Sequence, residues 1–232
     1  MPTSSLTLIS SMATKALLAD LVAAFSARHP DIAVAVTSVG GVDAARRVQA
    51  GEAFDIVALA SDAIERLAAG GHVLPDTRVD MVRSAVAVAV PAGAPRPDIS
   101  SEAALRAAVL AAPTLGYSTG PSGVQLARLF ERWGIAQQIA PRIVTPPPGV
   151  SVASLIARGE VALGFQQLSE MRGVAGIDVI GGLPEAVQIV TVFSAARASG
   201  SPQAAAVQAF LDFLASPETA ETKRGHGMEA VF

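Results

Sequence analysis

Hydroxyl side chains and glycines gather at the points where predicted strands lead into predicted helices. There are four such junctions: Ser10-Ser11-Met12, Ser38-Val39-Gly40-Gly41, Ser118-Thr119-Gly120-Pro121-Ser122-Gly123 and Pro148-Gly149-Val150-Ser151. A hydroxyl can donate a hydrogen bond to an anion, and glycine lets an anion approach the free N–H groups at a helix N-terminus. The pattern therefore predicts an anion cradle without cationic side chains.

The same residue types are also ordinary helix caps, in which the hydroxyl accepts a hydrogen bond from a backbone N–H group. Capping alone explains any single junction. For four junctions, two in each half of the chain, capping and a shared binding role are equally favoured. A hydrogen bond to a charged group contributes roughly 1.5 to 3 kcal/mol. About five of them would offset an association cost of roughly 4 to 15 kcal/mol if the site is preorganised.

Two adjacent amides, Gln166 and Gln167, follow the predicted strand at residues 161–165. They could bind a carboxylate or a hydroxyl, and the alternative is that they are exposed polar residues. Asp62 is expected to cap a helix instead of acting as a base.

Metal binding and hydrolysis are both disfavoured. The three histidines, His29, His72 and His226, have no partner at a metal-ligand spacing, so no metal site is expected. The chain lacks a phosphate-binding loop and a G-x-S-x-G nucleophile elbow. We expect no cofactor.

The composition excludes several other classes of protein. The chain has 232 residues, of which 51% are hydrophobic and 16% charged, with a net charge of −3 and no cysteine. This is too apolar for a disordered chain, and no run of Lys or Arg exceeds two residues, so nucleic-acid binding is disfavoured. The longest apolar stretch, residues 85–90, is far shorter than the about 20 residues of a membrane span.

Short apolar runs alternate with helical patterns, which predicts an α/β fold with a largely parallel sheet. Strands are predicted at residues 6–10, 32–37, 54–58, 84–90, 114–117, 142–145, 161–165, 177–180 and 187–193. Helices are predicted at residues 13–28, 42–50, 62–69, 101–111, 122–133, 151–158, 202–215 and 217–224.

Two long apolar runs, residues 84–90 and 187–193, are predicted to cross between two lobes. The first lobe is then discontinuous, residues 1–84 plus 192–232, and the second comprises residues 85–191. We expect a monomer. The sequence Met1-Pro2-Thr3-Ser4 lacks the basic and apolar regions of a secretory signal. The protein is therefore expected in the periplasm if a signal was removed, and otherwise in the cytoplasm.

Five short motifs follow one another along the chain: Ser10-Ser11-Met12-Ala13, Ser38-Val39-Gly40-Gly41, residues 51–62 (GEAFDIVALASD), 159–164 (GEVALG) and 210–217 (FLDFLASP). In this order the sequence resembles the molybdate-binding proteins of ABC transporters over essentially its whole length. The resemblance implies the type II periplasmic binding-protein fold. That fold has two α/β lobes with mostly parallel sheets flanked by helices, two hinge crossings, and an oxyanion held in the cleft between the lobes by serine hydroxyls and backbone amides.

The resemblance also implies ligand-binding roles for individual residues. Ser10 and Ser38 match the oxyanion-binding serines of the first lobe, Ala58 a backbone donor, and Val152 or its neighbours a donor of the second lobe. The candidate ligand-binding residues are Ser10, Ser11, Met12, Ser38, Gly40, Gly41, Ala58, Ser61, Thr119, Ser122, Gly149, Val150, Ser151, Val152, Gln166 and Gln167.

The sequence also departs from the family in two places. Gln167 stands where the molybdate-binding proteins have a ligand-contacting Tyr, and Thr119-Gly120-Pro121-Ser122-Gly123 replaces a Pro-Ala-Gly turn. Both changes weaken specificity for a tetrahedral oxyanion and favour a larger, carboxylated ligand.

These observations lead to three hypotheses of function. The leading one is a protein that binds a small anion, either a molybdate- or tungstate-type oxyanion or a di- or tricarboxylate, and presents it to the permease of an ABC importer. The alternative is a cofactor-free isomerase of a polycarboxylate, because the wider group resembled here includes aconitate isomerase. Such an enzyme needs a base for an allylic proton, and the sequence does not identify one. The third is an intracellular ligand sensor.

Overall fold

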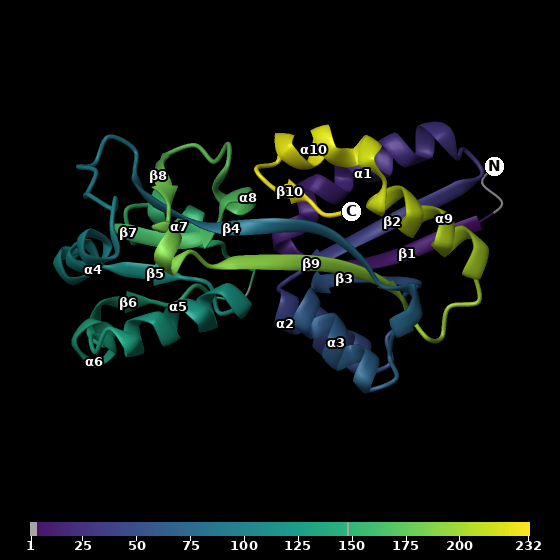
Figure 1. The fold of residues 1–232 in the computed structure, drawn as a ribbon, viewed down its shortest axis with the longest axis horizontal. Helices are drawn as coiled ribbons and strands as arrows, with labels where there is room; N and C mark the ends of the chain where they lie inside the picture. Colours follow the sequence, from purple (N-terminus) through teal and green to yellow (C-terminus); the bar gives the residue numbers. More distant parts are fainter. Residues whose placement is uncertain (1–3, 148) are drawn as a thin grey trace. The chain divides into compact units, whose positions relative to one another are not determined.

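The protein is described from a computed structural model that covers residues 4–147 and 149–232. Pro148, the first residue of the fourth predicted junction, therefore lies outside the described residues. The chain forms two compact units, Met1–Ser84 with Val192–Phe232, and Ala85–Thr191. Strands β4 (Val79–Pro91) and β9 (Val190–Arg197) carry the chain from one unit into the other (Figure 1).

The first unit, called unit 1 below, is built on a three-stranded parallel core. Its elements besides parts of β4 and β9 are β1 (Ser4–Ser11), α1 (Lys15–Arg28), β2 (Ile32–Val39), α2 (Gly41–Gln49), β3 (Ile56–Ala60), α3 (Ser61–Ala69), α9 (Ala204–Ala215), α10 (Ala220–Gly225) and β10 (Glu229–Ala230). Strand β1 lies between β2 and β3 and is parallel to both, whereas β9 pairs with β3 in the antiparallel direction.

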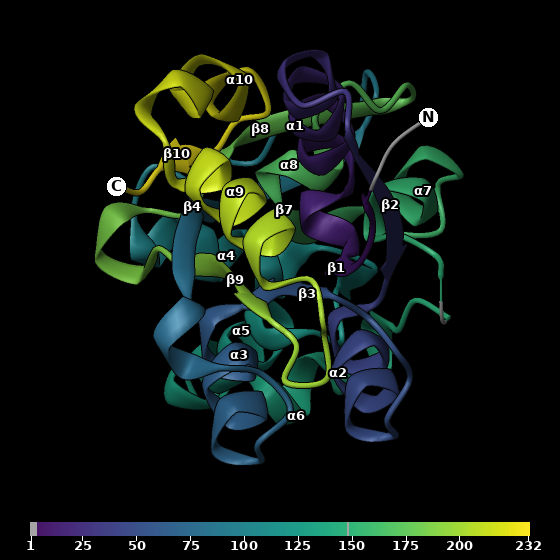
Figure 2. The same cartoon turned by 90° about the vertical axis from the view of Figure 1, so that its right-hand side faces the viewer.

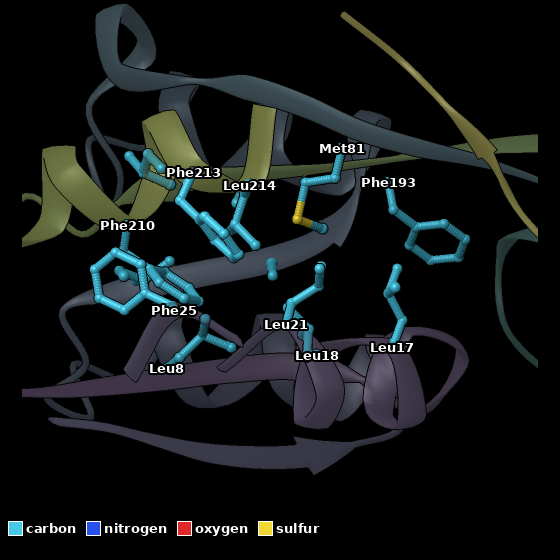
Figure 3. Packing of buried hydrophobic residues seen from close by; sticks show 14 of the residues in the cluster. Leu8, Leu17, Leu18, Leu21, Phe25, Met81, Phe193, Phe210, Phe213 and Leu214 are labelled. Carbon is cyan, nitrogen blue, oxygen red and sulfur yellow. The ribbon is translucent and has the colours of Figure 1, made fainter. Parts of the chain in front are cut away.

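Helices cover both faces of the sheet of unit 1, because successive side chains of each strand point to opposite faces. On one face, Leu8 of β1 packs with Phe25 of α1 and Phe210 of α9 (Figure 3). On the other face, Ile9 and its neighbours pack against α2 and α3. Figure 2 shows α1 and α9 on one side of β1 and β3 and the pair α2 and α3 on the other.

The second unit, called unit 2 below, repeats this plan. Its elements besides parts of β4 and β9 are α4 (Glu102–Ala111), β5 (Leu115–Tyr117), α5 (Pro121–Arg132), α6 (Ala136–Ile139), β6 (Ile143–Val144), α7 (Val152–Ala157), β7 (Leu163–Gln167), α8 (Leu168–Met171) and β8 (Ile177–Gly182). Strand β5 lies between β6 and β7 and is parallel to both, and β4 pairs antiparallel with β7 and β8. The predicted α/β fold with mostly parallel sheets is confirmed.

Close packing fixes α7 against this sheet. A Cβ atom on Gly164 of β7 would lie 2.8 Å from Cγ1 of Ile156 and 3.0 Å from Cγ1 of Val152, both of α7. Ile156 and Val152 are almost fully buried. The glycine therefore lets α7 rest directly on β7.

Several predicted boundaries are wrong by a few residues. The strand expected at 54–58 is β3 at Ile56–Ala60, the one expected at 161–165 is β7 at Leu163–Gln167, and the one expected at 187–193 is β9 at Val190–Arg197. Residues Glu185–Val187 form a 3-10 turn instead. The boundary of β7 differs because this strand pairs with β4. Val86 and Ala87 of β4 lie opposite Gln167 and Gln166, and this pairing extends β7 through two polar residues.

We expect Gly164→Ala to lower the free energy of unfolding by about 1 to 3 kcal/mol, the usual cost of overpacking a core. Urea denaturation of the purified protein measures this. Gly200→Ala is the matched control, because no atom lies within 4 Å of the added Cβ. Equal stability of the two variants would contradict the tight contact between α7 and β7.

Candidate functional site

The register of the parallel strands in unit 1 gathers three predicted residues at one edge. Ser10 near the end of β1 lies opposite Ser38 of β2 and opposite Ala58 of β3. Because parallel strands end on the same side of a sheet, the segments that follow them also lie at this edge. These segments are residues 10–12, 38–43 and 58–62, and none of them contains Lys or Arg.

The hydroxyl groups of Ser10 and Ser38 form a hydrogen bond with each other, with 2.7 Å between their oxygens. Ser10 is fully buried and can donate its single proton either to Ser38 or to the carbonyl of Ser11, 3.3 Å away, whereas Ser38 is half-buried. When Ser10 donates to Ser38, the proton of Ser38 is left for a ligand. Neither hydroxyl caps a helix. Ser38 is therefore the hydroxyl that a ligand can reach, and Ser10 orients it.

Two helices begin at the same edge without a side-chain cap. Gly40 is the N-cap of α2 and Gly41 its first residue, while Ala60 and Ser61 occupy the same positions in α3. The first N–H groups of a helix have no partner within the helix. Since no side chain caps them, the N–H groups in the first turns of α2 and α3 can donate to a ligand.

Asp62 does not cap α3, contrary to the prediction. It forms an ion pair with Arg66 one turn later, 2.8 Å apart, and Asp43 pairs with Arg46 in the same way on α2. These exposed ion pairs offset the negative charges that lie nearest the two helix N-termini.

Ser11 and Met12 continue β1 into a 3-10 turn, Met12–Thr14. The Thr14 hydroxyl donates to the Ser11 carbonyl at 3.2 Å and lies 3.5 Å from the Ser11 hydroxyl. A Cβ on Gly41 would lie 3.7 Å from Cβ of Ser11, so this turn and the start of α2 are neighbours.

The junction between β5 and α5 in unit 2 is a tight loop. The hydroxyls of Ser118 and Ser122 are 3.3 Å apart, and a Cβ on Gly123 would collide with the carbonyl of Ser118, its carbon 2.6 Å away. Thr119 lies in this loop before α5, and Ser122 is the second residue of the helix. No side chain caps α5.

The junction before α7 is used for capping. Ser151 accepts a hydrogen bond from the Ser154 N–H group at 3.1 Å, which is the geometry of an ordinary N-cap. Gly149 has a positive φ of +78°, and Val150 follows it in the turn. Val152 is the first residue of α7 and is buried.

The prediction that Gln166 and Gln167 follow the strand is wrong, and so is the alternative that they are exposed polar residues. They are the last two residues of β7, each only 3% exposed, and they point to opposite faces of the sheet. Gln167 donates from Nε2 to the hydroxyl of Thr191 at 2.8 Å, and its buried Oε1 has no partner among the described residues. The two amides therefore do not act as one adjacent pair.

Gln166 connects α7 to an acidic residue that sequence reasoning missed. Its Oε1 accepts from the Ala153 N–H group at 3.0 Å, and its Nε2 donates to Oε1 of Glu170 on α8 at 2.8 Å. Burial raises the pKa of Glu170 to about 7, although the bond from Gln166 acts in the opposite direction. The only signal in the sequence was the four-residue spacing of Gln166 and Glu170 after a buried strand.

Asp55 has structural partners. Asp55 is buried and accepts from the N–H and hydroxyl groups of Thr7 and from the Ser201 hydroxyl. Burial alone would raise the pKa of Asp55, but these hydrogen bonds leave it below its usual value. Residues 4–147 and 149–232 contain no group of three His, Asp or Glu that could hold a metal ion, and none of their helices is long and apolar enough to cross a membrane.

The two α/β units with their two connecting strands define the type II periplasmic binding-protein fold. The structure is similar to the periplasmic molybdate-binding protein of Azotobacter vinelandii, with a TM-score of 0.81, 18% identity and coverage of 98% of this chain and 100% of that one. It is also similar to the sulfate-binding protein SubI from Mycobacterium tuberculosis H37Rv, with a TM-score of 0.80, 17% identity and coverage of 98% and 87%.

Sequence comparison assigns the family. The profile of the family described as bacterial extracellular solute-binding protein matches residues 6–229, and the chain belongs to this family. Aconitate isomerase from Pseudomonas sp is 38% identical to it over 186 residues, which is 80% of this chain and 71% of that protein.

We expect Ser151→Ala to lower the free energy of unfolding by about 0.5 to 2 kcal/mol, because the variant loses the N-cap of α7. Ser61→Ala, at the uncapped start of α3, is expected to stay within about 0.5 kcal/mol of the parent. Chemical denaturation followed by circular dichroism measures both. If Ser61→Ala is the more destabilising change, the assignment of capping roles is wrong.

Proposed function

We propose that the protein binds a small anion with neutral hydrogen-bond donors, and that its ligand is an organic polycarboxylate. One observation carries the proposal. The register of β1, β2 and β3 places the Ser10 and Ser38 hydroxyls beside two helices, α2 and α3, whose first N–H groups have no side-chain cap. If the serines served only as caps, their hydroxyls would accept from those N–H groups.

Neutral donors suffice for an anion when several act together. Hydrogen bonds to a charged group contribute roughly 1.5 to 3 kcal/mol each, and a helix N-terminus adds about 0.3 to 1 kcal/mol. The donors sit on strand ends and helix starts, so little conformational entropy is lost when the ligand binds. No cationic side chain has to be desolvated.

The proposed ligand-binding residues of unit 2 are Thr119, Ser122, the segment from Gly149 to Val152, and Gln167. Gln167 supports a carboxylated ligand. The Thr191 hydroxyl can either accept from the amide nitrogen of Gln167 or donate to its oxygen, so the free end of the amide can be a donor or an acceptor. A donor there suits a carboxylate, and an acceptor suits a hydroxyl or a carboxylic acid group.

The relationship to aconitate isomerase supports the same ligand class. At 38% identity this relative is much more similar in sequence than the molybdate- and sulfate-binding proteins, whose identities of 18% and 17% support only the fold. We therefore favour a tricarboxylate such as aconitate over a tetrahedral oxyanion.

The role that best fits the family is the substrate-binding component of an ABC importer. Such a protein would act in the periplasm as a monomer and pass its ligand to a permease. If cell fractionation places the protein in the cytoplasm, it would be an enzyme or a ligand sensor instead.

Isomerisation of a polycarboxylate is the second candidate function. Two observations favour it: the relationship to aconitate isomerase, and a carboxyl group, that of Glu170, whose pKa of about 7 suits proton transfer near neutral pH.

Isothermal titration calorimetry with cis-aconitate, trans-aconitate, citrate, molybdate, tungstate and sulfate tests the ligand class. We expect a polycarboxylate to bind with a dissociation constant in about the micromolar range or below, which corresponds to roughly 8 kcal/mol. The inorganic oxyanions are expected to bind more weakly. Tighter binding of molybdate or tungstate would overturn the ligand class, and binding of none of the six anions would contradict the proposal as a whole.

Ser38→Ala and Ser10→Ala are each expected to weaken binding of the best ligand by roughly 1 to 3 kcal/mol, or about 5- to 150-fold. The Ser38→Ala variant loses a direct donor to the ligand, and the Ser10→Ala variant loses the hydroxyl that orients Ser38. Ser101→Ala is the matched control, because Ser101 caps α4 by accepting from the Ala104 N–H group. Ser101→Ala should lower stability and leave affinity unchanged. If Ser38→Ala behaves in the same way, the serine pair is not part of the site.

A further inference from the structure

We propose that Glu170 is the general base that moves the allylic proton of a polycarboxylate. This inference rests on the second proposed function, the isomerisation, and supplies the base that the sequence does not reveal.

Glu170 lies at the edge of unit 2 that corresponds to the serine edge of unit 1. It is on α8, which begins directly after Gln167 at the end of β7. Strand β7 runs parallel to β5, so α8 starts on the side of the sheet where β5 leads into α5. The candidate residues of unit 2 lie at the end of β7 and in or beside the segments that lead from β5 into α5 and from β6 into α7, at this same edge.

A chain of two hydrogen bonds holds the carboxyl group in place. The Ala153 N–H group donates to Oε1 of Gln166, and Nε2 of Gln166 donates to Oε1 of Glu170. The first bond fixes the amide so that its NH2 group faces Glu170. Since both Gln166 bonds lie within unit 2, the carboxyl group is oriented before any ligand arrives. Gln166 is thus the positioning residue.

The surroundings bring the pKa of this carboxyl group to about 7. Burial raises its pKa from 4.5 to about 7, and the bond from Gln166 lowers it by less. The charged groups nearest in sequence or on the neighbouring strand β8 are Arg172 and Asp178, and Asp178 is bonded to Arg96. The shift has two causes, burial and the hydrogen bond from Gln166, and neither is one of these charges. A base with this pKa can both remove and return a proton near pH 7.

The proposed step conserves atoms and electrons without a cofactor. In aconitate, the Glu170 carboxylate takes a proton from the methylene carbon, and the electron pair of that C–H bond moves into a new C=C bond to the central carbon. The electrons of the original double bond move to the other terminal carbon, which takes the same proton back from Glu170. The double bond has then shifted by one position, and its geometry can be cis or trans. Donors to the substrate carboxylates stabilise the carbanion that forms between the two transfers.

Other carboxyl groups are less suited to this role. Asp55 has its oxygens occupied by Thr7 and Ser201 and lies at the start of β3, away from the strand ends. Asp43 and Asp62 are exposed and paired with arginines. Glu170 combines partial burial, a fixed orientation and a place at the strand ends.

Glu170→Gln is the decisive variant, with turnover of cis- and trans-aconitate followed by chromatography and hydrogen exchange followed by NMR in D2O. We expect turnover and deuterium incorporation to fall by about 100-fold or more, while the dissociation constant measured by calorimetry changes only a few-fold. Glu170→Asp should retain part of the activity. Glu160→Gln, which removes an exposed carboxylate paired with Arg158, is the control and should change neither quantity.

The pH profile gives a second readout. The rate of the parent protein should rise between pH 6 and 8 with an inflection near pH 7, as Glu170 loses its proton. Glu170→Gln is expected to fold, because the raised pKa means that ionisation of Glu170 costs stability from about pH 4.5 upward and in full above pH 7, and the amide removes that cost.

The outcomes separate the two proposals. If the parent isomerises aconitate and Glu170→Gln does so equally fast, Glu170 is not the base and the isomerase function stands. If the parent binds a polycarboxylate but shows neither turnover nor exchange, the isomerase function fails and the role of Glu170 fails with it, while the binding function stands. Loss of exchange in Glu170→Gln with intact binding supports both.

Discussion

The site depends above all on the hydrogen-bond register between parallel strands. In unit 1, the ladder from Ser4 opposite Ile32 to Ser11 opposite Val39 leaves Ser10 beside Ser38, and the ladder to β3 brings Ala58 to the other side of Ser10. A slip of one residue would turn every side chain to the opposite face of the sheet. Leu8 and Ile9 are fully buried on opposite faces, so the two cores fix the register that pairs the serines.

Low charge is a property of the site as well as of the composition. Arginines of the described residues are paired on the surface in several places, as in Arg66 with Asp62 and Arg158 with Glu160. Such exposed pairs contribute little, about 0 to 1 kcal/mol. The segments at the edge of unit 1, residues 10–12, 38–43 and 58–62, contain no arginine or lysine. Backbone N–H groups and hydroxyls are weaker donors individually, but the fold holds them in place and several can act on one anion.

Much of the fold was predictable because it follows from local patterns. Alternating strands and helices, and the Ser38 to Gly41 and Ser10 to Met12 junctions, are visible in the sequence. The function of each serine is not, because a cap and a ligand donor use the same residue types. Ser151 is a cap and the Ser10 and Ser38 pair is not, and this difference depends on partners up to 28 residues away.

The polar end of β7 shows the same limit. Gln166 and Gln167 end an apolar strand and were expected outside it, but pairing with β4 and the bonds to Ala153 and Thr191 keep them inside and buried. The pKa of Glu170 is likewise set by burial, which only the tertiary structure supplies.

A crystal structure of the protein with trans-aconitate tests most directly the claim that neutral donors bind the anion. We expect a ligand carboxylate within hydrogen-bond distance of the Ser38 hydroxyl and of N–H groups in the first turns of α2 and α3. A ligand bound elsewhere, with its carboxylates on lysine or arginine side chains, would contradict it.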